Sequence, residues 1–67
     1  MVINGEKIAE LRVSKGLSQE ELGHMVGVSN VAIHYVETGK KPVQVSVLAS
    51  IANVFGVTVD SLLKQSA

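Results

Sequence analysis

Four side chains near the middle of the chain have types and a spacing suited to molecular recognition. They occupy positions i, i+1, i+4 and i+5, which lie along one side of a helix: Asn30, Val31, His34 and Tyr35. An Asn amide can make two hydrogen bonds to adenine, and a Val side chain can pack on the methyl group of thymine. Tyr35 is long enough to reach a base edge or a phosphate. These side chains could therefore contact base edges, provided that a helix presents them outward.

Residues for catalysis or metal binding do not form a recognisable pattern. His24 and His34 are ten residues apart and no cysteine supports them, whereas a structural zinc site needs four ligands. Ser, His and Asp all occur, but so small a chain offers no evident cleft to hold them in register. We expect no enzymatic activity, no cofactor, no metal and no small-molecule substrate.

Length and charge narrow the class of protein further. The 67 residues suffice for one domain, and six Lys and Arg balance six Asp and Glu. A net charge of zero counts mildly against a nucleic-acid partner, because such domains are usually basic. The charges are uneven, however, since Glu37 is the only acid between His24 and Asn53. The other four glutamates all precede that stretch: Glu6, Glu10, Glu20 and Glu21.

No part of the chain has the sequence features of a membrane or export segment. No apolar run approaches the roughly 20 residues that cross a bilayer. The amino end lacks the basic region and the long apolar stretch of a signal peptide. We expect a cytoplasmic protein without a membrane partner.

Five short helices are predicted to position these residues, at about 5–15, 19–26, 30–38, 45–55 and 59–65. Four begin with a polar cap residue that has an apolar residue before it and another four positions after it: Asn4, Ser18, Ser29 and Thr58. Glu21 completes a capping box with Ser18. Residues 43–47 alternate like a strand, but Pro42 precedes them and the helical pattern follows. The sequence therefore predicts an all-α, compact bundle in a single domain spanning residues 1–67.

The core of this bundle is predicted to be aliphatic, because Tyr35 and Phe55 are the only aromatic residues. Apolar residues at helical spacing mark the inward faces. They are Ile8, Ala9, Leu11, Leu22, Met25, Val26, Ala32, Ile33, Val36, Val45, Leu48, Ala49, Ile51, Ala52, Phe55, Val59, Leu62 and Leu63.

The connection between the second and third predicted helices is the most informative stretch. Only Gly27-Val28-Ser29 separates them, so the later helix must cross the earlier one steeply. Gly27 can adopt the left-handed conformation that ends a helix, and Ser29 can cap the next. This is the geometry of a helix-turn-helix over about residues 18–38, whose second helix can enter the DNA major groove.

The chain resembles the Cro/repressor (XRE-type) family of helix-turn-helix domains over about residues 6–63. The similarity lies in Leu11-Arg12, the segment KGLSQEEL at 15–22, the turn Gly27-Val28-Ser29, ETGKKP at 37–42 and FGVTVDSLL at 55–63. Residues 22–33 are especially similar to the amino-terminal domain of a lambdoid phage repressor. Departures are Gly23 where the family usually has Ala, a proline one residue closer to Gly39, and a third helix without Arg or Gln.

The resemblance implies roles for individual residues. Arg12 and Glu37 would form an ion pair between the first and third helices. The positions that the family uses to read base edges are those of Asn30, Val31, His34 and Tyr35 in this chain. Phosphate contacts are expected from residues near the ends of the helix-turn-helix: Lys15, Gln19, Ser29, Lys40 and Lys41. For the lysines, the alternative interpretation is a solvated loop.

The carboxyl-terminal part of the chain is predicted to mediate dimerisation. Its apolar residues exceed what five short helices need for a core, and a second apolar stripe on a small domain suggests an interface. Family members dimerise through their last helices. We therefore expect a homodimer formed by residues 54–67, with these interface residues: Val54, Val57, Val59, Leu62 and Leu63.

Two classes of function follow from these features. The first is a sequence-specific DNA-binding transcriptional regulator, expected to be a repressor that binds a palindromic operator in double-stranded DNA. A phage repressor or Cro, a restriction-modification controller, an antitoxin and the DNA-binding part of a longer repressor all fit the scaffold. The alternative is a protein-interaction module that keeps the fold without binding DNA, which the zero net charge favours.

Overall fold

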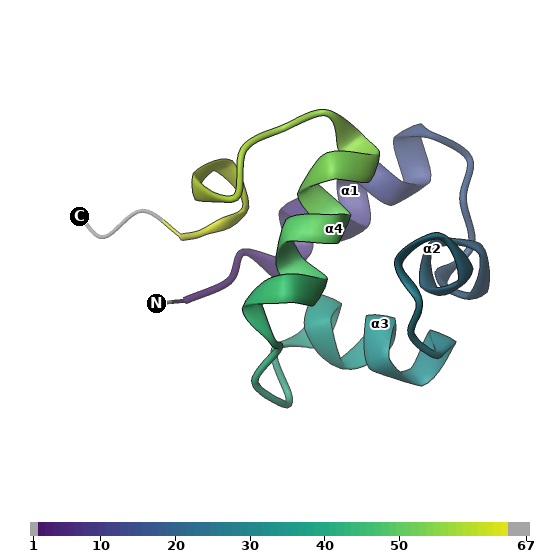
Figure 1. The fold of residues 1–67 in the computed structure, drawn as a ribbon, viewed down its shortest axis with the longest axis horizontal. Helices are drawn as coiled ribbons and strands as arrows, with labels where there is room; N and C mark the ends of the chain where they lie inside the picture. The colour runs from purple at the N-terminus through teal and green to yellow at the C-terminus, as the bar shows by residue number, and fades with distance from the viewer. Residues whose placement is uncertain (1, 65–67) are drawn as a thin grey trace.

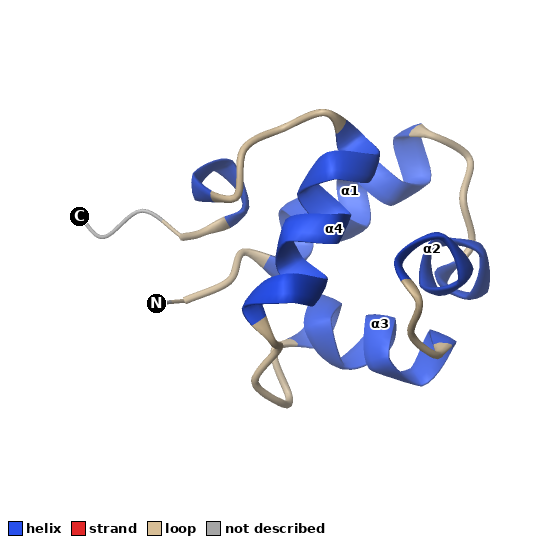
Figure 2. Ribbon diagram, in the orientation of Figure 1, coloured by secondary structure: helices blue, strands red, loops and turns tan. Residues whose placement is uncertain are grey.

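Four α-helices and one 3-10 turn make up the fold of the computed structural model, which describes residues 2–64 (Figures 1 and 2). The helices are α1 (Gly5–Ser14), α2 (Gln19–Val26), α3 (Asn30–Thr38) and α4 (Val45–Phe55), and the turn η1 spans Asp60–Leu62. The first four helices match the predicted ranges to within one residue. None of the helices within residues 2–64 is long and apolar enough to cross a membrane.

The predicted cap residues start three of the helices. Asn4 Oδ1 accepts a hydrogen bond from the backbone N–H of Lys7 at 3.2 Å, and Ser29 Oγ accepts one from Ala32 at 3.1 Å. Ser18 and Glu21 form the complete capping box, with each side chain bonded to the other residue's backbone N–H. Each such cap contributes about 1 kcal/mol, because it satisfies a backbone donor that has no partner within the helix.

One continuous core, aliphatic except for Phe55, joins all four helices and η1. Its buried members are Ile8, Leu22, Ile33, Val36, Leu48, Ile51, Ala52, Phe55 and Leu62. The helix α2 packs against both α3 and α4, whereas α1 packs against α3 and η1. Every described element therefore contributes to the core that holds α3 in place.

Three residues predicted to face the core are exposed instead. Met25 is 57% exposed because Gly23 is buried, which turns the inward face of α2 toward Gly23 and away from Met25. Val45 is 63% exposed in the first turn of α4, and Ala49 is exposed on the same helix. The face of α4 that packs on the rest of the protein is centred on Leu48 and Phe55, so Val45 and Ala49 lie beyond its margin on the side of Ala52.

The predicted fifth helix is wrong, because the chain makes only the short turn η1. Val59, not the predicted Thr58, is the cap residue of this turn, although Thr58 Oγ1 does accept a hydrogen bond from Ser61 N at 3.2 Å. Leu63 then becomes extended and pairs antiparallel with Ile3. The flanking bonds run from Asn4 N to Leu62 O at 2.7 Å and from Lys64 N to Val2 O at 2.8 Å. Pairing with the amino-terminal segment thus takes the backbone out of the helix; residue 65 of the predicted helix lies outside the described residues.

The segment between α2 and α3 has the expected helix-turn-helix geometry. Gly27 ends α2 in the left-handed conformation, with φ of 80°, and α3 begins after the cap residue Ser29. Figure 1 shows α2 along its axis while α3 runs across the view, so the two helices cross steeply. Gly23 permits the close approach, because a Cβ atom there would lie 2.5 Å from Val28 O. The departure from the family's Ala at this position thus has a packing reason.

Candidate nucleic-acid interface

The helix α3 buries one face and presents the other to solvent. Ile33 and Val36 are buried against the core, whereas Asn30, Val31 and His34 are exposed. Val31 is 51% exposed although it is aliphatic. The structure therefore gathers the first three predicted base-reading residues on one open surface of α3.

Tyr35, the fourth predicted base-reading residue, lies half-buried at the margin of that surface. Its ring centroid is 4.7 Å from Lys41 Nζ, a cation–π arrangement. The ring of the neighbouring residue His34 is also near, with the two centroids 6.2 Å apart and the planes tilted by 54°. The contact with Lys41 connects α3 to the loop that follows it, and sequence reasoning did not predict it.

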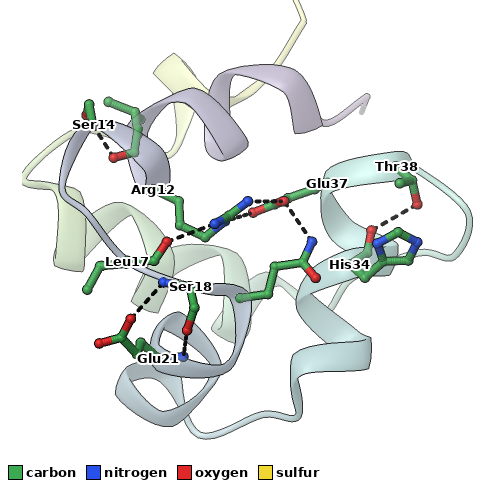
Figure 3. Close-up of polar contacts among 10 residues, drawn as sticks. Arg12, Ser14, Leu17, Ser18, Glu21, His34, Glu37 and Thr38 are labelled. Carbon is green, nitrogen blue, oxygen red and sulfur yellow. Dashed lines mark hydrogen bonds and ion pairs between the residues drawn. The ribbon is translucent and has the colours of Figure 1, made fainter.

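Arg12 and Glu37 connect α1 to the end of α3. Arg12 Nε donates to Glu37 Oε2 at 2.7 Å and Arg12 Nη2 donates to Glu37 Oε1 at 3.2 Å (Figure 3). The two side chains are 16% and 6% exposed, so the pair is largely removed from water. Two parallel bonds between planar groups restrict their relative orientation, so this pair sets the position of α3 on α1.

The hydrogen bonds of this pair extend to α2 and to the loop before it. Gln19 Nε2 donates to Glu37 Oε1 at 3.0 Å, and Arg12 Nη1 donates to Leu17 O at 2.8 Å. We call Arg12, Gln19 and Glu37 the three-helix cluster, since each comes from a different helix. The contact of Gln19 with Glu37 was not predicted, and it means that one amide N–H of Gln19 is already engaged.

Gly5 brings the start of α1 against the end of α3. It is buried, and a Cβ atom there would lie 2.2 Å from Glu37 O and 2.7 Å from Val36 O. Only a residue without a side chain fits so close to these carbonyls. Sequence reasoning missed this contact, because the position of Gly5 directly after the cap Asn4 is also typical of helix starts that lie open to solvent.

The remaining predicted phosphate-contacting residues surround α3 and the start of α2. Ser29 is exposed and caps α3, and its hydroxyl hydrogen is free to rotate toward an acceptor. Lys40 and Lys41 are exposed in the loop after α3, and Lys15 is exposed at the end of α1. A hydroxyl group therefore lies at the start of α3, and two cations follow its end.

The residues predicted for dimerisation fall into two groups. Val54, Val57, Val59 and Leu63 are half-buried and pack along the margin of the core. Leu62 is fully buried inside it, so its assignment to an interface is wrong. Residues 65–67 of the predicted dimerisation region lie outside the described residues.

Comparisons with known proteins place this geometry among helix-turn-helix domains. The profile of the helix-turn-helix family (HTH_3) matches residues 8–62. The chain is 33% identical, over 60 residues, to the SPbeta prophage-derived uncharacterized HTH-type transcriptional regulator YonR of Bacillus subtilis (strain 168). The match covers 90% of this chain and 56% of YonR, so the chain spans about half the length of that curated relative.

Two solved structures are similar over almost their full length. The P22 c2 repressor in complex with synthetic operator 9T has a TM-score of 0.87 at 33% identity, covering 98% of this chain and 100% of that one. The restriction-modification controller protein C.AhdI from Aeromonas hydrophila has a TM-score of 0.80 at 30% identity, covering 88% and 89%. The all-helical arrangement of this chain is thus that of repressor and controller proteins.

Proposed function

Because the chain belongs to the Cro/repressor (XRE) type of helix-turn-helix family, we propose that it is a sequence-specific DNA-binding transcriptional regulator. In this proposal it acts as a repressor, binding a palindromic operator as a homodimer in the cytoplasm. The observation that carries the proposal is the exposed face of α3, where Asn30 and Val31 lie beside His34. An exposed aliphatic side chain at the start of such a helix has a use if it packs against thymine methyl groups.

The proposed reading surface consists of Asn30, Val31, His34 and Tyr35. Asn30 would bond to adenine and Val31 would contact thymine, so the half-site would contain A·T pairs. The three-helix cluster supports this role, because it holds α3 against α1 and α2 through hydrogen bonds of 2.7 to 3.2 Å. A rigidly held helix loses little orientational freedom when it enters the groove.

Phosphate contacts are proposed for the residues at the ends of α3 and α2. The start of α2 offers backbone N–H groups to an anion, and Gln19 retains a second amide hydrogen beyond the one given to Glu37. Ser29, Lys15, Lys40 and Lys41 would complete the set. Few cations per monomer imply a shallow dependence of affinity on salt concentration.

Dimerisation is proposed through the half-buried apolar residues of the carboxyl-terminal region. These are Val54, Val57, Val59 and Leu63. A second copy related by a twofold axis would bring two reading helices onto successive half-sites of one operator. Two copies would also double the small number of phosphate contacts.

The proposal is tested by selecting bound duplexes from a random pool of double-stranded DNA and measuring their affinities over a range of salt concentrations. We expect a palindromic consensus and a linear fall of log affinity with log salt. A flat enrichment profile, with no salt-dependent complex, would overturn the proposal. That result would favour the protein-interaction module, which the zero net charge and the absence of Arg from α3 support.

A further inference from the structure

We propose that Lys41 is a positioning residue for base reading, because it holds the ring of Tyr35 at the margin of the exposed face of α3. This inference rests on the proposed function and assigns Lys41 a role beyond that of a phosphate contact. Its basis is the ring contact, in which Lys41 Nζ lies 4.7 Å from the centroid of Tyr35. A cation at this distance is attracted to the face of the aromatic ring.

A pocket beside Tyr35 offers the ring an alternative position. A pocket of about 200 Å³ lies between α3 and the start of α4, and Tyr35 and Lys41 form part of its wall. The rest of its lining is mostly aliphatic and includes Val28, Ala32, Val43 and Val47. Burial of an aromatic ring against such side chains is favourable in free energy. Without its cation, the ring can turn into this pocket and withdraw its hydroxyl group from the reading surface.

The loop that carries Lys41 is anchored independently of any DNA. Gly39 ends α3 in the left-handed conformation, and the N–H groups of Gly39 and Lys40 both donate to Tyr35 O, at 2.8 and 3.2 Å. The backbone carbonyl of Tyr35 therefore holds the start of the loop, and the ring of Tyr35 contacts Lys41, two residues after Gly39. This closed arrangement links the conformation of the loop to that of the reading residue.

The adjacent lysine provides a matched control. Lys40 is exposed in the same loop and has the same charge, but within residues 2–64 only Lys41 stacks on an aromatic ring. A phosphate contact made by either lysine would change binding to all sequences alike. A positioning role would change base preference, and only for Lys41.

The first measurement uses the free protein. Tyr35 is the only tyrosine and the chain has no tryptophan, so intrinsic fluorescence reports on this one ring. We expect Lys41→Met to change the fluorescence intensity and the acrylamide quenching of Tyr35, and Lys40→Met to leave both unchanged. In proton NMR spectra, the ε-methylene signals of Lys41 should be shifted upfield by the ring, retained in Tyr35→Phe and lost in Tyr35→Leu. Unshifted ε-methylene signals in the wild type would overturn the inference.

The second measurement uses the random DNA pool. Selection with Tyr35→Leu identifies the base pair whose preference depends on this side chain. We expect Lys41→Met to weaken preference at the same base pair by about two- to five-fold, the range of an exposed cation–π contact, and Lys41→Arg to restore it. The double variant Tyr35→Leu with Lys41→Met should lose no more preference at this base pair than Tyr35→Leu alone.

The outcomes separate the two proposals. A uniform loss of affinity in Lys41→Met, equal to that of Lys40→Met and without a change in preference, would overturn the positioning role and leave the proposed function standing. Absence of any selective complex with the wild-type protein would overturn the proposed function and the reading role together. The fluorescence and NMR results on the free protein would still show whether Lys41 holds the ring.

Discussion

Arg12 holds the carboxylate of Glu37 with two hydrogen bonds, of 2.7 and 3.2 Å, between residues that are 25 positions apart in the sequence. A third bond, from Gln19, reaches the same carboxylate at 3.0 Å. Glu37 lies one residue before the end of α3, so this contact fixes the helix near its carboxyl end. A largely buried pair of this kind is better suited to specifying geometry than to adding stability.

The losses of stability caused by removing the two charges of this pair should therefore not be additive. We expect Glu37→Gln to lower the free energy of unfolding by about 2 kcal/mol, between the values for surface and buried pairs. The double variant Arg12→Met with Glu37→Leu should cost less than the sum of its single changes, because no buried charge is left without a partner. Denaturant unfolding followed by circular dichroism measures the cycle, and strictly additive costs would contradict the coupling.

Gly23 should resist replacement by the alanine that the family usually has. Its Cβ would lie 2.5 Å from Val28 O, so the turn of the helix-turn-helix must shift. We expect Gly23→Ala to destabilise the fold by about 1 to 3 kcal/mol, although alanine is the better helix former. Thermal unfolding tests this prediction. The control is Ala49→Gly at an exposed helix position, which measures the difference in helix propensity between alanine and glycine alone. A Gly23→Ala variant more stable than the wild type would contradict the packing argument.

Truncating a proposed reading residue should reduce base preference, whereas truncating a proposed phosphate contact should reduce affinity for all sequences. Asn30→Ala and Val31→Ala should each reduce discrimination between the selected operator and its single-base variants by about 1 to 3 kcal/mol. Lys40→Ala should weaken all duplexes alike and reduce the salt dependence by about one phosphate contact. Titration of labelled duplexes measures both quantities. Unchanged selectivity in Asn30→Ala would place the reading surface elsewhere.

Substitutions of the carboxyl-terminal apolar residues should affect either folding stability or self-association, depending on whether the residue lies in the core or in the proposed interface. Leu62 is fully buried, so Leu62→Ala should lower the free energy of unfolding by about 2 to 5 kcal/mol. Val59 is half-buried, and Val59→Lys should weaken self-association at least about ten-fold, since a twofold axis introduces the new charge from both copies. Sedimentation equilibrium measures the association. A dimer unaffected by Val59→Lys would argue for a different interface.

Local signals predicted the helices well because each signal acts within a few residues. The caps at Asn4, Ser18 and Ser29 form the predicted backbone bonds, and the turn at Gly27 has the expected left-handed conformation. The fifth helix failed for the opposite reason. Thr58 Oγ1 accepts a hydrogen bond from Ser61 N, yet Val59 is the cap of η1 and pairing of Leu63 with Ile3 ends the turn after Leu62. No local pattern encodes that distant partner.

The sequence by itself determined the all-helical class, the ends of four helices and the helix-turn-helix connection, since these depend on caps, periodicity and a three-residue loop. Family resemblance added the pairing of Arg12 with Glu37. Only the tertiary structure decided that Gln19 joins this pair, that Met25 faces solvent, that Leu62 belongs to the core and that Lys41 meets the ring of Tyr35. Each of these depends on how elements that are distant in the sequence approach one another, as at Gly5 and Gly23, where a missing side chain lets two backbones come close.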